Sequence, residues 1–305
     1  MKTKESIHIL AVLFAFCFLG TLSHAQINIT VLETFNYPGG TATTSTAPQK
    51  INDHGDVVGI FTDANSATFG FVRFANGTFS PLITEPNDTS DFTQGRGINN
   101  SRTICGDYIG SDGEVHAFFR VGGTFTEYDV PDATGTEVLG INNAGDFAGS
   151  FVPNAGLETP FISIGGTVTP IDIPTLIFGA AYQINDANAV VGAYYDGSAI
   201  HGFYQDSTGA LQFPIDPPGS GETLLRGIND QNWIVGTYYN DSGQHGYCLF
   251  HQADLRPSTI VEIELLWMGS IAQGISVAAT LTLDCTKRVG LSPGRHAQRK
   301  TRPSC

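Results

Sequence analysis

The sequence predicts an all-β protein, a β-propeller of about five four-stranded blades. One phrase, Ile and Asn followed by Asn or Asp, returns along the chain at spacings of 47, 43, 43 and 44 residues. An apolar run that contains Gly follows each copy, and four short strands in about 44 residues is the size of a propeller blade. The five copies are Ile51-Asn52-Asp53, Ile98-Asn99-Asn100, Ile141-Asn142-Asn143, Ile184-Asn185-Asp186 and Ile228-Asn229-Asp230.

The composition agrees with this fold class. The chain has 36 Gly, 20 Phe and 10 Tyr, and charged residues make up only 14% of it. Long charged side chains such as Lys and Glu fill the exposed faces of helices, whereas aromatic residues are enriched in strands. The composition therefore favours β structure.

Residues 1–25 have the pattern of an export signal. Lys2 and Lys4 precede the apolar stretch 9–19, and Ser23-His24-Ala25 fits a signal-peptidase site, so the mature chain is expected to begin at Gln26. No later run reaches the roughly 20 apolar residues that a membrane span requires. We expect a secreted protein, extracellular or periplasmic, without a membrane span.

Each repeat is interpreted as four strands, which together give the propeller domain 26–250. The first strand ends at the repeated phrase, whose Asn and Asp suit a tight turn because they tolerate left-handed geometry. The second is the apolar run, whose Gly allows backbones or aromatic rings to approach closely. The third opens with His in three repeats, and the fourth alternates before a Pro, as in the segment 124–131.

The two ends of the repeat array suggest how the ring closes. Residues 29–37 resemble a fourth strand without its first three, so this N-terminal strand is expected to complete the fifth blade. Closure of this kind removes the free sheet edges that invite aggregation. The alternative is a sixth, degenerate blade near Gln273-Gly274-Ile275. Residues 251–305 are otherwise predicted to be a degenerate, partly disordered C-terminal segment.

The charge of the repeat domain limits which partners it can bind. Residues 26–250 contain 24 acidic and 6 basic residues, a balance that repels nucleic acid. Glycan or extracellular protein is the expected partner, and we expect a monomer.

Cys105 and Cys248 occupy different points of the repeat, so both are expected to be buried and unpaired.

The repeat signature resembles that of the extracellular HAF-repeat proteins of bacteria. The His-Ala-Phe triplet stands at 116–118, with variants at 201–203 and 245–247, and Gly precedes the Ile-Asn phrase at Gly97, Gly140 and Gly227. The first and third repeats depart from the triplet. The resemblance covers about residues 28–250 and implies export and a repeat fold, but no reaction.

The recurring histidines, His116, His201 and His245, are expected to hydrogen-bond neighbouring loops rather than to form a ring-like binding site. The loops between second and third strands are better candidates, because they gather on one face of a propeller. Carboxylates there could hydrogen-bond sugar hydroxyls beside tyrosines or bind Ca²⁺, although no cofactor is required by any motif. The predicted ligand-binding residues are Asp63, Asp112, Glu114, Asp196, Asp241, Tyr108, Tyr195 and Tyr239.

No sequence motif predicts catalysis. The chain contains neither a Gly-x-Ser-x-Gly elbow nor an HExxH zinc motif. The prediction is therefore a non-catalytic binding or scaffold module at or outside the cell surface. The alternative is a carbohydrate-active hydrolase or lyase that uses carboxylates in the central opening.

Overall fold

The computed structural model describes residues 34–41, 43–154, 156–250 and 260–263. These residues form nineteen strands in successive antiparallel units, and no helix occurs among them. The first three units are β1 (Ser45–Ile51), β2 (Val57–Thr62), β3 (Thr68–Arg73); β4 (Thr93–Ile98), β5 (Ile104–Ile109), β6 (Val115–Val121), β7 (Thr124–Tyr128); and β8 (Ala133–Ile141), β9 (Phe147–Pro153), β10 (Thr159–Ile164), β11 (Thr167–Pro170).

The fourth and fifth units share one sheet, because a single parallel bridge joins Ile200 to Glu222. We call the units the first to fifth sheets. The last two are β12 (Phe178–Ile184), β13 (Val190–Tyr195), β14 (Ile200–Gln205), β15 (Leu211–Ile215); and β16 (Glu222–Ile228), β17 (Trp233–Asn240), β18 (Gly243–Phe250), β19 (Ile260–Ile263).

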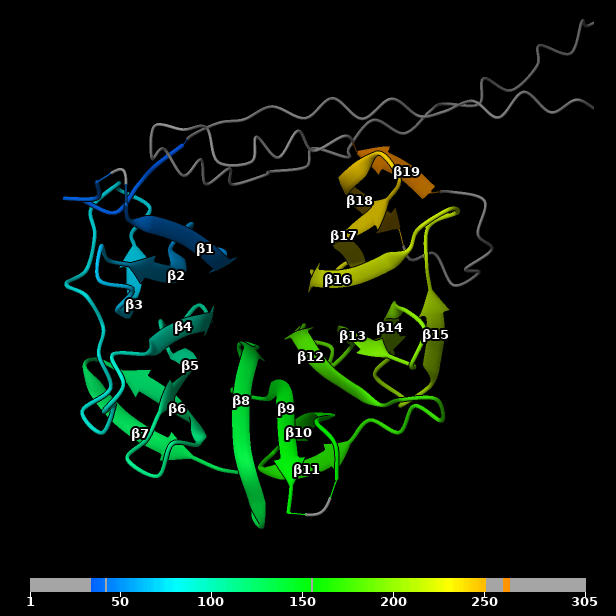
Figure 1. Cartoon of the computed structure of the whole chain (residues 1–305), viewed down its shortest axis with the longest axis horizontal. Coiled ribbons are helices and arrows are strands. Elements are labelled where there is room, and N and C mark those ends of the chain that lie inside the picture. The colour runs from blue at the N-terminus through cyan, green and yellow to red at the C-terminus, as the bar shows by residue number, and fades with distance from the viewer. Residues whose placement is uncertain (1–33, 42, 155, 251–259, 264–305) are drawn as a thin grey trace, which may run out of the picture.

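The sheets lie around a common centre, as in a propeller. Strands β1, β4, β8, β12 and β16 face that centre, and the later strands of each sheet lie farther out (Figure 1). Each of these inner strands ends at the Ile of the repeated phrase, as the sequence predicts. In the first sheet, bridges from Gly70 to Ile83 and from Arg73 to Phe79 take the place of a full fourth strand.

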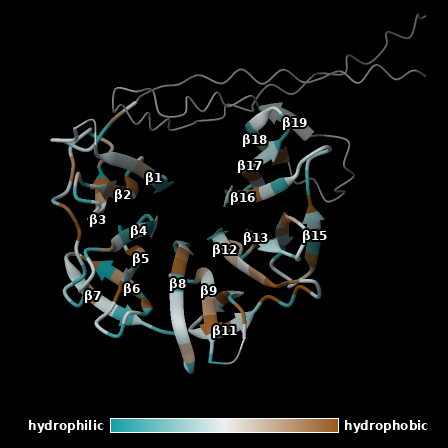
Figure 2. Cartoon of the chain, viewed as in Figure 1, coloured by the Kyte–Doolittle hydropathy of each residue, from teal (hydrophilic) through white to brown (hydrophobic). Residues whose placement is uncertain are grey.

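The core lies between consecutive sheets. Four apolar clusters each combine a second-strand residue of one sheet with the repeated Ile of the next, for example Val58 with Ile98 and Cys105 with Ile141. Brown stretches in β2, β8 and β9 show this apolar content in Figure 2. Cys105 and Cys248 are both buried, as expected from their positions in the repeat.

The glycine of the second strand leaves space for an aromatic ring on the third. A Cβ placed on Gly59 would lie 2.7 Å from the Phe71 ring, and one on Gly106 would lie 2.8 Å from the Phe118 ring. Contacts this short are incompatible with a side chain in a close-packed interior. The repeated Gly and the aromatic residue of the third strand are therefore one packing unit.

The repeated asparagine joins each sheet to the next, a role that the sequence analysis did not predict. The side-chain amide of Asn52 donates to the carbonyl of Asn99 at 3.1 Å. The same bond runs from Asn99 to Asn142 at 3.1 Å, from Asn142 to Asn185 at 3.2 Å and from Asn185 to Asn229 at 2.9 Å. We call this series the asparagine ladder.

The repeated phrase leads into a tight turn, as the sequence predicts, but the left-handed residue of that turn is not the repeated Asn or Asp. The residues with positive φ in these turns stand four positions after the repeated Ile: Gly55, Arg102, Gly145, Asn188 and Asn232. The repeated Asn instead accepts a backbone amide of its own turn through Oδ1, as Asn142 does from Asp146 at 2.9 Å. Its amide group is therefore needed for two hydrogen bonds, one local and one to the next sheet.

The predicted N-terminal closing strand also differs from the structure. The fourth strand of the fifth sheet is β19, which pairs antiparallel with β18. The described part of the predicted strand lies on the first sheet, where the Tyr37 ring packs 4.9 Å from Phe61 and the Tyr37 hydroxyl donates to Ser80. Residues 29–33 lie outside the described residues, and so do residues 251–305 except 260–263.

Candidate functional site

The five inner strands share one irregularity, and its side chain differs in each. Every inner strand has a β-bulge two residues before the repeated Ile. A bulge leaves one residue unpaired and redirects its side chain, and bulges are common beside functional sites. The bulged residues are Gln49, Arg96, Leu139, Tyr182 and Arg226.

Arg96 forms an ion pair with a buried carboxylate. Its Nε donates to Asp107 Oδ1 at 2.6 Å, and the Asp107 side chain is fully buried. Burial raises the pKa of Asp107, while the neighbouring guanidinium of Arg96 acts against this rise. Burial lowers the pKa of Arg96, but the attraction and hydrogen bond of Asp107, together with the charge of Glu137, raise it overall.

Glu137 lies in the same charged group, on β8. Burial, together with repulsion from Asp107 and Glu158, raises the pKa of Glu137 to about 7, although Arg96 and a hydrogen bond from Ser150 Oγ at 3.2 Å act in the opposite direction. A carboxyl group with a pKa near 7 is protonated in half of the molecules at neutral pH. It can therefore donate or accept a hydrogen bond, or a proton.

A second charged group connects the first and fifth sheets. The guanidinium carbon of Arg226 lies 4.6 Å from the centre of the Tyr182 ring, a cation–π distance. The ammonium of Lys50 donates to the Arg226 carbonyl. Burial and the charge of Arg226 lower the pKa of Lys50 to about 7.

These groups form one set of interacting side chains. Tyr182 interacts electrostatically with Arg226, Glu137 and Arg96 as well as Glu158, and burial raises its pKa. Within the described part of the chain, three buried oxygens of this region have no protein hydrogen-bond partner: Gln94 Oε1, Asp107 Oδ2 and Gln183 Oε1. We define the inner-strand cluster as Lys50, Arg96, Asp107, Glu137, Tyr182 and Arg226.

A pocket of about 110 Å³ lies against the fourth sheet beside this cluster. Its lining residues include Tyr182, Leu224, Glu158, Phe178 and Tyr195. The Phe178 and Tyr195 rings are stacked, with centroids 5.0 Å apart and an angle of 30° between their planes. Phe178 is exposed, so an apolar ring face is presented to solvent at this pocket.

The predicted acidic ligands have local roles in their own turns. Asp63 Oδ1 accepts the backbone amides of Asn65 and Ala67, and Asp112 Oδ1 accepts that of Glu114. Asp196 Oδ1 accepts the amide and hydroxyl of Ser198 and the amide of Ala199. The hydrogen bonds from Ser198 are the largest cause of the lowered pKa of Asp196.

The predicted tyrosines do not share one surface. Tyr108 is buried in the cluster between the first and second sheets, where a ligand cannot reach its ring. Tyr195 lines the 110 Å³ pocket. Tyr239 and Asp241 line a different, open pocket of about 490 Å³ together with Ser220 and Glu222.

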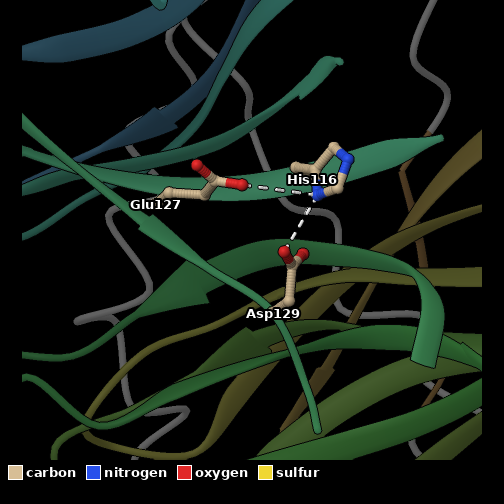
Figure 3. A group of neighbouring side chains, drawn as sticks. All are labelled: His116, Glu127 and Asp129. Carbon is tan, nitrogen blue, oxygen red and sulfur yellow. Dashed lines mark hydrogen bonds and ion pairs between the residues drawn. The ribbon is translucent and has the colours of Figure 1, made fainter. Parts of the chain in front are cut away.

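The recurring histidines bridge acidic loops. His116 Nδ1 lies 2.9 Å from Asp129 and 3.6 Å from Glu127, as Figure 3 shows, and His116 Nε2 lies 3.1 Å from Asp112. Burial lowers the pKa of His116, but the hydrogen bonds to Asp129 and Asp112 outweigh it and the pKa is raised.

His201 repeats this arrangement, with Asp216 at 2.7 Å and Asp196 at 3.2 Å, and His245 bonds Ser242 and Asn240. Ligand atoms of His116, Glu127 and Asp129 lie within 4.8 Å of one another, close enough to hold a cation. Because Asp129 and Asp112 stabilise the charged imidazole of His116, we interpret the His116 group as a clamp between loops. The expectation of Ca²⁺ stays a prediction.

The comparisons with known proteins define the fold class as a β-propeller. No protein-family model and no curated protein sequence matches the chain. Two of the similar solved structures are TolB proteins. TolB from Acinetobacter baumannii has a TM-score of 0.53 and 8% identity over 68% of this chain and 52% of TolB. A putative TolB from Agrobacterium tumefaciens has a TM-score of 0.52 and 10% identity over 71% of this chain and 79% of that protein.

The matched region thus spans about half the length of Acinetobacter TolB, and the likeness shows the fold alone. No helix in the described ranges is long and apolar enough to cross a membrane.

Sequence reasoning missed the inner-strand cluster. The cluster breaks the repeat by substitution at one position and not by an inserted segment. The signal was nevertheless present, because aligned repeats place Gln49, Arg96, Leu139, Tyr182 and Arg226 at one position while the neighbouring Ile and Asn are constant.

Proposed function

We propose that this protein is an exported, monomeric propeller that binds glycan without transforming it, and that the pocket beside Tyr182 is its ligand site. The single observation that carries this proposal is the exposed Phe178 ring, stacked on Tyr195, at a pocket that Glu158 also lines. Binding pockets commonly combine aromatic walls with a few polar groups that set orientation.

The chemistry of the pocket suits a neutral sugar. The C–H face of a pyranose ring can pack on the Phe178–Tyr195 stack, since the face of an aromatic ring is electron-rich. Its hydroxyl groups can then donate to the Glu158 carboxylate, and a charge-assisted hydrogen bond of this kind is stronger than a neutral one. Glu158 disfavours a sugar acid in the same position, because two carboxylates repel each other.

A glycan array on the full mature chain is the first experiment, followed by calorimetric titration of the strongest hit. Phe178→Ala is expected to weaken binding at least tenfold, or about 1.4 kcal/mol, whereas Phe178→Tyr retains it. Val121→Ala is the matched control, because Val121 is exposed and lies in another sheet. Equal affinity for Phe178→Ala and the parent protein would contradict this site.

Tyr239→Ala separates the two pockets. If ligand binding is lost in Tyr239→Ala and kept in Phe178→Ala, the ligand occupies the open pocket near Asp241 instead. No binding to any glycan by a folded protein would contradict the glycan proposal as a whole.

A carbohydrate-active enzyme is the second candidate, and one observation favours it. Glu137, with a pKa raised to about 7, could act as a general acid, and Glu158 is close enough to contribute to that shift. Glycoside hydrolysis uses two carboxyl groups, one of them with a raised pKa. Incubation of a bound oligosaccharide with the parent protein and with Glu137→Gln decides between the two. Turnover that Glu137→Gln abolishes would establish the enzyme.

A further inference from the structure

One pair of apolar positions recurs at each of the four contacts between consecutive sheets. The residue seven positions after the repeated Ile of one sheet packs in the same cluster as the repeated Ile of the next. Each member of these four pairs is at most 8% exposed. The pairs are Val58 with Ile98, Cys105 with Ile141, Ala148 with Ile184 and Val191 with Ile228.

The fifth pair is not buried. Direct packing of the fifth sheet on the first would join Val235 to Ile51 by the same rule. Ile51 is 50% exposed, whereas the other four repeated Ile residues are 1–8% exposed, and Val235 is 38% exposed, whereas its four equivalents are 0% exposed. Between the other sheets these two kinds of apolar face pack on each other. On the fifth and first sheets, the faces that carry Val235 and Ile51 are exposed instead.

We propose that residues 264–285 of this same chain fill the space between these two faces as a sixth, blade-like unit. The unit needs a repeated Ile to cover Val235 and a small or β-branched residue, seven positions later, to cover Ile51. Gly274-Ile275 stands 47 residues after Gly227-Ile228, the same spacing as between Ile51 and Ile98. Thr282 stands at the second required position.

The path of the chain agrees with this assignment. After the fourth strand of one sheet, four to seven residues lead to the inner strand of the next: 129–132, 171–177 and 216–221. The chain leaves the fifth sheet at Ile263, the end of β19. An inner strand at 269–275 would follow a connection of five residues, 264–268, which lies within that range. It would also replace the direct hydrogen bond from Lys50 to the Arg226 carbonyl.

The predicted contacts are specific. Ile275 packs on Val235 as Ile228 packs on Val191, and Thr282 faces Ile51. The unit has Ser276 where the others have Asn, so it cannot extend the asparagine ladder through a side-chain amide. Its attachment therefore depends on the burial of apolar side chains such as Ile275.

Photo-crosslinking of the full chain tests the proposal. Val235 is replaced by p-benzoylphenylalanine, and the same replacement at Val121 is the control, since Val121 is 58% exposed on another sheet. A crosslink from position 235 to residues 269–285 in monomeric protein is the expected result. A crosslink to β1 or β2 would mean that the first and fifth sheets close directly, and a crosslinked dimer would mean that a second copy covers the face. Either of these, or no crosslink at all, would overturn the proposal.

Thermal denaturation tests the sixth unit independently of the crosslinking experiment. Ile275→Asp in the full chain should lower the thermal midpoint by about 4 °C or more, because a charge placed between packed sheets is costly. Val121→Asp should leave the midpoint unchanged, and Val191→Asp, at a fully buried position, should lower it. An unchanged midpoint for Ile275→Asp would show that Ile275 is not packed.

Discussion

The asparagine ladder and the inner-strand bulges lie only three residues apart along each inner strand, yet they follow opposite rules. The ladder position is Asn in all five sheets, and its amide makes the same bond to the next sheet wherever a next sheet follows. The bulge position is Gln, Arg, Leu, Tyr and Arg in turn. The constant Asn therefore joins neighbouring sheets, whereas the variable bulge residue determines which side chains lie near the centre of the molecule.

The largest expected effect is at the repeated Gly of the second strand. In Gly106→Ala the new Cβ would lie 1.9 Å from the Gln94 carbonyl and 2.8 Å from the Phe118 ring. Overpacking of this severity should reduce the free energy of unfolding by about 3 kcal/mol, measured by urea denaturation. The matched control is Gly135→Ala, whose Cβ has no neighbour closer than 3.8 Å. Similar losses in both variants would contradict the packing rule.

The next largest effect is expected at the ladder itself. Asn142→Ala removes the bonds to Asn185, Asn188 and the Asp146 amide, and it leaves buried groups without partners. The expected loss is about 2 kcal/mol, from the same denaturation measurement. Asn65→Ala, which changes an exposed loop asparagine, should cost less than about 0.5 kcal/mol. If the two variants are equally stable, the ladder does not hold the sheets together.

The effect expected at Glu137 depends on pH and has the opposite sign. The pKa of Glu137 is about 7 in the folded protein against 4.5 for a free Glu, so the folded state binds the proton more tightly. This contribution to stability is complete below pH 4.5 and is lost as the pH rises through 7. Glu137→Gln should therefore match the parent at pH 4 and be more stable at pH 8, by thermal denaturation. A Glu137→Gln variant less stable at pH 8 would contradict the assigned environment.

The sequence was sufficient for the elements that repeat. The period predicted the propeller fold, the ends of the inner strands and the close contact between Gly59 and the Phe71 ring, because each depends on a pattern that recurs five times. The function of the repeated Asn was not predictable from one repeat, since its amide bonds the carbonyl of the next sheet. Short-range reasoning assigned it to turn geometry instead.

The candidate site was harder to predict for a related physical reason. The pairing of Arg96 with Asp107 requires two strands of one sheet, and the contact of Arg226 with Tyr182 requires two sheets. Of the predicted ligands, Tyr195 lies at the proposed pocket. Asp63, Asp112 and Asp196 bond their own turns instead, because a carboxylate near a tight turn accepts the nearest backbone amides first.

The asparagine ladder also determines the order in which the sheets would unfold locally. A row of units that contact only their neighbours behaves as a one-dimensional lattice, in which units at an end have one neighbour and open first. As described, the ladder starts at Asn52 and finishes at Asn229, so the first and fifth sheets are its ends and the third sheet is its middle. Opening would begin on either side of the exposed Ile51 and Val235 faces and travel toward Asn142. A segment that covered those faces would turn a lattice with two ends into a ring that has none.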